Sequence, residues 1–204
     1  MSNKLLSDQL SGPFAEVIES SLDTFIAQSW SWDVFPKFGS LIQVKNKTET
    51  ILGCVTNIKT GSMDPQRYPF PYQKTEDELK AEQPQIFEFL KTTFEVKVLG
   101  YKQENKIFYL LPPTPAKIHA FTYNSSPDLT KTFFRNPDFM HLLFSSQNTI
   151  NHFDDLLLAI FNEFDESSLG AFCDKFSLLT GNDYRRLKLF LQRAEVLIDN
   201  NRYK

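Results

Sequence analysis

The hydrophobic period of this chain changes once, close to residue 125, and this change limits what the chain can fold into. Before it, apolar and polar side chains alternate in short runs, as in residues 93–101, which is typical of β-strands. From Pro127 onward, apolar side chains recur every three or four positions, which is typical of amphipathic helices. We therefore predict an α+β protein, with a small antiparallel β-barrel domain over residues 1–125 and an α-helical domain over residues 126–204.

The first part contains several short runs with strand character. They cover residues 15–20, 24–28, 38–44, 50–58, 93–101 and 106–110, and residues 118–123 are predicted as a last edge strand. The polar turn at residues 45–48 predicts a hairpin between the third and fourth runs. Gly39 and Gly53 lie inside strand patterns and predict bulges or close backbone contacts, as expected where a sheet curls into a barrel.

An insertion at residues 61–92 separates two of these strands. Its first part, residues 64–73, holds three prolines and cannot form a helix. Its second part has two helix-start signals, a capping box made by Thr75 and Glu78 and a first-turn proline at Pro84. We expect an extended, aromatic segment followed by short helices.

The second part predicts three amphipathic helices preceded by one or two shorter ones within residues 128–144. The apolar stripes are Phe153, Leu156, Leu157, Ile160, Phe161 and Phe164, then Leu169, Phe172, Cys173, Phe176 and Leu179, and then Tyr184, Leu187, Phe190, Leu191, Ala194, Leu197 and Ile198. Gly181 follows the second stripe and is a natural helix stop. These helices can bury a common core as a bundle.

Composition excludes several classes of protein. The net charge of -3 gives no general attraction to nucleic acid or anionic membranes, and no apolar run is long enough for a membrane helix. The first ten residues lack the apolar run of a signal peptide. Cys54 and Cys173 lie among apolar neighbours in different predicted domains, which favours buried free thiols and a cytoplasmic location. The 20 Phe residues are spread along the chain and are interpreted as core filler.

Residue patterns for catalysis or metal binding are missing from the sequence. The three histidines have no metal-ligand spacing, and the carboxylate pairs Asp154–Asp155 and Asp165–Glu166 are interpreted as solvated helix charges. No serine lies in a nucleophile elbow. We therefore predict a protein that is not an enzyme, with no catalytic residue, no metal site and no cofactor.

Several short motifs in the first part occur in the order found in a known barrel family. They are residues 15–21 with Phe25, residues 36–42, residues 52–56 and residues 111–113. In this order they resemble the HAS-barrel (HerA–ATP synthase barrel) family, a small barrel of about six strands found in ATP synthase subunits and in hexameric DNA-translocating ATPases. The whole chain is similar to small stand-alone cyanobacterial HAS-barrel proteins of unknown function, which share residues 82–92 and 111–119.

The resemblance implies assembly and not catalysis. Motor relatives need a glycine-rich loop that ends in Lys and Ser or Thr and cradles phosphates, and none of the seven glycines here lies in such a pattern. In those relatives the barrel packs beside its neighbours in a ring. We therefore expect a non-catalytic assembly or adaptor protein that binds a protein partner or itself.

Two segments are candidate contact sites. In the insertion, alternating prolines and rings present Arg67, Tyr68, Phe70 and Tyr72, which either dock into a partner or fold back and plug the barrel. The last helix is locally basic, with Arg185, Arg186, Lys188 and Arg193. These cations either form a solvated helix face or support an alternative function as a nucleic-acid-associated accessory factor, which is not expected from the net charge.

Overall fold

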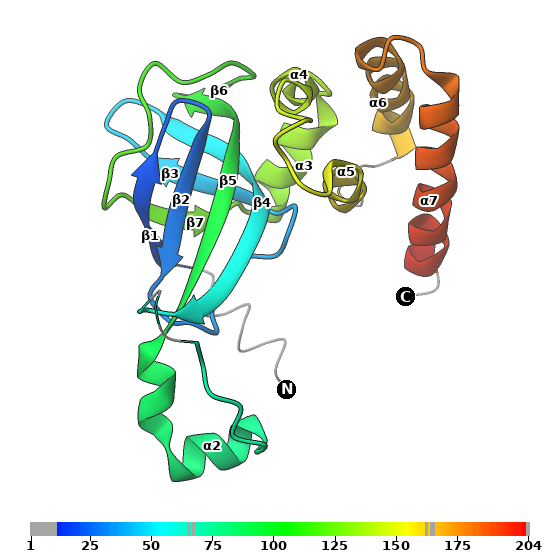
Figure 1. Ribbon diagram of the computed structural model, residues 1–204. Coiled ribbons are helices and arrows are strands. Elements are labelled where there is room, and N and C mark those ends of the chain that lie inside the picture. Colours follow the sequence, from blue (N-terminus) through cyan, green and yellow to red (C-terminus); the bar gives the residue numbers. More distant parts are fainter. Residues whose placement is uncertain (1–11, 65, 67, 162, 164–165, 203–204) are drawn as a thin grey trace.

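The computed structural model describes residues 12–64, 66, 68–161, 163 and 166–202. The antiparallel strands are β1 (Pro13–Ser20), β2 (Thr24–Ser29), β3 (Leu41–Lys45), β4 (Thr50–Ser62), β5 (Leu90–Gln103), β6 (Lys106–Phe108) and β7 (Phe121–Asn124). They are ordered β2-β1-β7-β3-β4-β5-β6, and an additional β2–β5 pairing closes six of them into a barrel, with β6 outside it (Figure 1). The predicted α+β class with a small antiparallel barrel is confirmed.

The barrel interior is filled by alternate residues of each strand. On β5, Phe94, Val96 and Val98 are buried. Thr93 and Glu95, which alternate with them, are only half-buried. Side chains of this kind fit a pleated surface well, and their burial against the opposite wall stabilises the sheet. The barrel core consists of Phe14, Ala15, Val17, Phe25, Ala27, Ile42, Val44, Ile51, Val55, Phe94, Val96, Val98 and Ala116.

Strand β7 is not the edge strand that the sequence predicted. It lies between β1 and β3, where Thr122 pairs with Ala15 on one side and Val44 on the other. Strands β1 and β3 are joined to β2 and β4, so each has one edge left, and β7 fills the gap between these two edges. Closure of this gap removes two exposed strand edges. The β1–β7 pairing joins residues more than 100 positions apart, which a local pattern cannot show.

Both glycines singled out in the strand patterns make close contacts. The β4–β5 register shifts between Leu52 and Gly53, and a Cβ on Gly53 would lie 2.6 Å from Cγ1 of Val96. Gly39 has a φ of +82°, and a Cβ there would lie 2.6 Å from the Cβ of Ala159. Because Ala159 belongs to a helix of the second part, Gly39 marks a point where a barrel loop and that helix touch.

The helices after the barrel pack on one of its sides. They are α3 (Pro127–Arg135), α4 (Phe139–Phe144), α5 (Phe153–Phe161), α6 (Glu166–Leu179) and α7 (Tyr184–Arg202). Figure 1 shows α3, α4 and α5 beside the barrel and α6 with α7 farther out. One apolar cluster unites Leu41, Leu52, Cys54 and Leu99 of the barrel with the helices. The division into domains at residues 125 and 126 stays a prediction.

The helical pattern is confirmed with two corrections. Two helices, α3 and α4, precede the three that carry the predicted stripes, and Gly181 follows α6 with a φ of +67°. Tyr184, the first residue of α7, is exposed and lies outside the core. Cys173 is half-buried, whereas Cys54 is fully buried as predicted, and both are free thiols. The side chains of Phe164, Leu197 and Ile198 lie outside the described residues.

No helix in the described part of the chain is both long and apolar enough to cross a membrane.

Candidate functional site

Residues 63–89, here called the arm, connect the ends of β4 and β5 and project from one end of the barrel (Figure 1). The two strands stay paired up to Ser62 and Leu90, and Met63 N donates to Phe89 O at 2.8 Å. The insertion therefore begins two residues after its predicted start at 61 and ends three residues before its predicted end at 92. The arm is the tip of a long hairpin, so a rigid strand pair fixes its base.

The helical end of the arm forms as the sequence predicts. Helix α2 (Glu76–Glu82) starts with the capping box, in which Thr75 N donates to Glu78 Oε2 at 2.7 Å and Glu78 N donates to Thr75 Oγ1 at 3.3 Å. These bonds lower the pKa of the Glu78 carboxyl, chiefly through the backbone N–H of Thr75. The next segment, η1 (Pro84–Phe89), is a 3-10 helix that begins with Pro84.

One aromatic stack joins the arm to the barrel. The ring of Trp32, in the loop after β2, stacks on Phe87 with centroids 5.4 Å apart, and the Trp32 carbonyl accepts a hydrogen bond from the Thr92 hydroxyl. The Lys80 ammonium lies 5.8 Å from the centroid of the Phe87 ring, a cation–π contact. These contacts hold η1 against the loop and orient the rest of the arm.

The rings of the proline-rich segment do not plug the barrel. Tyr68 is 91% exposed and Phe70 is 69% exposed, whereas Tyr72 is half-buried and packs edge-on against Phe70 at 5.4 Å. The interpretation of these side chains as a plug is therefore wrong for Tyr68 and Phe70, because the barrel interior is already filled by its own strand residues. Arg67, the fourth predicted residue, lies outside the described residues.

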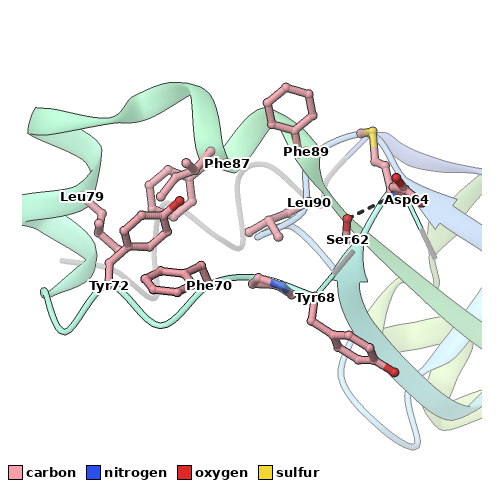
Figure 2. A pocket seen from close by; sticks show the side chains of 12 residues that line it. Ser62, Asp64, Tyr68, Phe70, Tyr72, Leu79, Phe87, Phe89 and Leu90 are labelled. Atoms are coloured by element: carbon pink, nitrogen blue, oxygen red, sulfur yellow. Dashed lines mark hydrogen bonds between the residues drawn. The ribbon is translucent and has the colours of Figure 1, made fainter. Parts of the chain in front are cut away.

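A groove of about 640 Å³ runs between the proline-rich segment and the helical end of the arm. Figure 2 shows Tyr72, Leu79 and Phe87 gathered at its helical end and Leu90 at its base, while the rings of Tyr68 and Phe89 point away from it. Ser62 Oγ accepts a hydrogen bond from Asp64 N at 3.1 Å at the strand end. The groove walls are mostly apolar and aromatic, which is typical of a docking surface.

A second apolar area lies next to the groove on the outer wall of the barrel. Its members, here called the shelf, are Ile18 on β1, Trp30 after β2 and Phe121 on β7, and each is about half exposed. The rings of Trp30 and Phe121 meet edge to face at 5.2 Å. Met63 and Leu90 line both the groove and a smaller hollow beside Trp30, so the arm and the shelf form one continuous surface.

Sequence reasoning missed the shelf. The prediction that phenylalanines are core filler holds for most of them but is wrong for Phe70, Phe89 and Phe121. The outward positions of Ile18 and Phe121 could be found only once the strand register was known, because these residues are far apart in the chain. In this register, Glu16 of β1 pairs with Gln28 of β2 on one side and with Phe121 of β7 on the other.

The basic last helix is partly engaged within the molecule. Arg186 donates to Asp154 Oδ1 at 3.1 Å and to Gln147 Oε1 at 3.2 Å, and Arg193 pairs with Asp155. The two aspartates of α5, interpreted as solvated charges, are thus partners of the α7 arginines. Arg185 and Lys188, by contrast, are exposed. Contact of this helix with nucleic acid stays a prediction.

Titratable groups with shifted pKa values have structural explanations. Burial raises the pKa of the Cys54 thiol, and burial with the nearby Asp138 charge raises the pKa of Tyr109 to about 12. The Tyr109 hydroxyl donates to Phe133 O at 2.8 Å, which ties the end of the barrel to α3. Among the residues that the structure describes, no group of His, Cys, Asp or Glu side chains could hold a metal ion.

The closed six-stranded antiparallel barrel agrees in fold with the family comparison. Residues 14–104 match the model of the HAS barrel domain. These residues therefore carry a HAS barrel domain, and the resemblance predicted from the strand motifs is confirmed for them. Strand β7, which completes the barrel, lies beyond the matched residues. The comparison with curated proteins found no match to this chain.

Proposed function

We propose that this protein is a non-catalytic assembly or adaptor protein, in which the barrel carries an apolar surface that binds another protein chain. The observation that supports this most strongly is the exposure of the arm rings, 91% for Tyr68 and 69% for Phe70. Large contiguous apolar patches on soluble proteins mark interaction sites, because water contact with them is unfavourable. The HAS barrel resemblance, which implies assembly, points in the same direction.

The shape of the arm suits a protein partner. Pro69 and Pro71 restrict the backbone around Phe70, and the Trp32–Phe87 stack fixes the other side of the groove. A preorganised segment loses little conformational entropy on binding, so its rings can contribute to affinity more fully. The rings of Tyr68 and Phe89 point away from the groove to different sides (Figure 2), which suits a broad protein surface better than a small molecule.

Catalysis has no part in this proposal. The motor ATPases that contain a similar barrel need a phosphate-cradling loop, which this sequence does not contain. We propose that the protein is located in the cytoplasm, where free thiols such as Cys54 and Cys173 stay reduced.

The proposal is tested with the tagged full chain expressed in its native host. Wild-type protein is compared with the arm variant Tyr68→Ser/Phe70→Ser and with Leu189→Ser, a matched change of an exposed apolar residue on α7. We expect wild-type protein and the Leu189 variant to co-purify with a protein partner, either another copy or a different chain, and the arm variant to lose it. Equal recovery by all three proteins, or recovery by none, would contradict the proposal.

A further inference from the structure

The arm and the shelf are adjacent, but the arm does not cover the shelf. The arm is held by its paired strand base and by the Trp32–Phe87 stack, and its ring at Tyr68 stays almost fully exposed. The shelf ring of Trp30 is 54% exposed beside a shallow hollow in the barrel wall. Because the arm is held away from the shelf of its own chain, the arm can cover a shelf only when two molecules meet.

We infer that the occupant of this surface is a second copy of the chain, with the arm of each copy lying on the shelf of the other around a two-fold axis. The inference rests on the proposed function and names its partner. In a two-fold contact the same patch is used on both subunits, so a surface must contain both halves of the fit. Tyr68 and Phe70 supply the projecting half, and Ile18, Trp30 and Phe121 supply the receiving half.

The exposed area is the size that a dimer needs. The surface presents four exposed rings and two aliphatic side chains, namely Tyr68, Phe70, Trp30, Phe121, Met63 and Ile18. An aromatic side chain buries roughly 150–250 Å² when it is fully covered. Because these side chains are 44–91% exposed, the set amounts to on the order of 700 Å², close to the roughly 800 Å² that one partner contributes to a standard interface. A small peptide would leave much of it uncovered.

Charge favours contact of the arm with the shelf over contact of one arm with another. The first turn of α2 carries Glu76, Asp77 and Glu78, while Lys80 in its last turn is paired with Glu76. Two arms in contact would bring these acidic turns together, and like charges at an interface disfavour association. The hollow at the shelf is lined instead by Lys91 and by Glu16, and the Glu16 carboxylate is hydrogen-bonded to His119 Nδ1 at 3.2 Å.

Complementation between two variants tests the inference. The arm variant Tyr68→Ser/Phe70→Ser keeps an intact shelf, and the shelf variant Trp30→Ser/Phe121→Ser keeps an intact arm. Alone, each should dimerise at least about thirtyfold more weakly than the wild type, because both arm–shelf contacts are impaired in its homodimer. Mixed, they form a heterodimer with one intact arm–shelf contact, so the mixture should associate more tightly than either variant alone.

The measurement is sedimentation velocity of the full chain, with one variant fluorescently labelled so that the mixed dimer is seen directly. Leu189→Ser is the matched control and should dimerise like the wild type. Thermal melting checks that each variant is folded, and Ile18→Ser replaces the double shelf variant if that one melts early.

The outcomes separate the inference from the proposed function. A mixture that associates no better than its components excludes arm-to-shelf exchange. A monomeric wild type that captures a different host protein through Tyr68 and Phe70 refutes the second copy but keeps the proposed function. A monomeric wild type that captures nothing refutes both.

Discussion

Phenylalanine has opposite environments in the helical core and in the arm. Phe176 is fully buried, with ring centroids of Phe190, Phe144 and Phe172 at 5.1, 5.7 and 6.1 Å. Phe70 is 69% exposed and meets the ring of Tyr72 at 5.4 Å. A buried ring stabilises the fold, whereas an exposed ring on a fixed backbone is available to a partner. The two regions show that composition alone does not separate buried rings from exposed rings.

The sharpest test of this comparison is Phe176→Ala. Removal of this fully buried ring, which packs against the rings of Phe144, Phe172 and Phe190, leaves a cavity, and we expect a loss of about 3–5 kcal/mol of stability. Chemical denaturation of the full chain measures it, with Phe70→Ala as the matched change in the arm. Similar losses for the two variants would break the comparison.

The next largest effect is expected at the junction of barrel and helices, at Gly39. Its φ of +82° strains any side chain, and a Cβ would lie 2.6 Å from the Cβ of Ala159. Gly39→Ala should therefore cost about 2–3 kcal/mol, since the left-handed conformation alone costs roughly 1–2. Gly61→Ala is the control, because nothing lies within 4 Å of its added Cβ.

A second change sharpens the prediction at this junction. The double variant Gly39→Ala/Ala159→Gly removes the close contact but keeps the backbone strain. The new glycine in α5 costs some helix stability by itself. We expect the double variant to be more stable than the sum of the two single changes predicts, because the close contact is gone. If urea unfolding shows no gain in the free energy of unfolding over that sum, the loop and α5 are not in close contact.

Arg186 and Arg185 provide a test within α7. The Arg186 guanidinium lies 5.8–5.9 Å from the ring centroids of Phe144, Phe153 and Phe176 and is hydrogen-bonded to Asp154. Arg186→Met should lower stability by about 1–2 kcal/mol, whereas Arg185→Met should change it little. Thermal unfolding of both variants measures this difference. Nucleic-acid binding, if measured, should then depend on Arg185 rather than on Arg186.

A smaller effect concerns pH and the β1–β2 turn. The Ser21 hydroxyl, which donates to Asp23 Oδ1 at 2.7 Å, and the Lys97 ammonium at 3.0 Å from Oδ2 lower the pKa of the Asp23 carboxyl. Because the folded pKa lies below the unfolded one, this stability is complete above about pH 4–5 and is lost as the pH falls through the folded value.

The expected size of this term is below about 1 kcal/mol, because the Asp23 side chain is half exposed and screened by water. Asp23→Asn should therefore flatten the stability profile between neutral and acidic pH only slightly. The profile is measured by denaturation at a series of pH values, and a steeper dependence in the variant than in the wild type would contradict the assignment.

The smallest effect on folding is expected in the arm. Tyr68→Ala and Phe70→Ala should each change the free energy of unfolding by less than about 0.5 kcal/mol, because their rings are mostly in water. Thermal melting measures this at a concentration where the protein is monomeric. A large loss in a monomer would show that these rings pack within their own chain.

Local signals in the sequence were enough for the elements themselves. The capping box of Thr75 and Glu78, the stop at Gly181 and the alternation along β5 depend on contacts between near neighbours, and all three occur in the structure. The barrel class also followed, since several motifs in order resemble the HAS-barrel family. The candidate arm was found because alternating prolines and rings are a property of one continuous segment.

What the sequence did not determine depends on pairing between distant residues. The place of β7 between β1 and β3, and the shelf made by Ile18, Trp30 and Phe121, exist only in the closed register of the barrel. The pairing of Arg186 with Asp154 likewise required α5 and α7 to pack together. Strand alternation shows which residues share a face, but the face that meets water is fixed by which strands close the barrel and which helices cover it. The tertiary structure alone therefore decided which aromatic side chains are buried in the core and which are exposed to water.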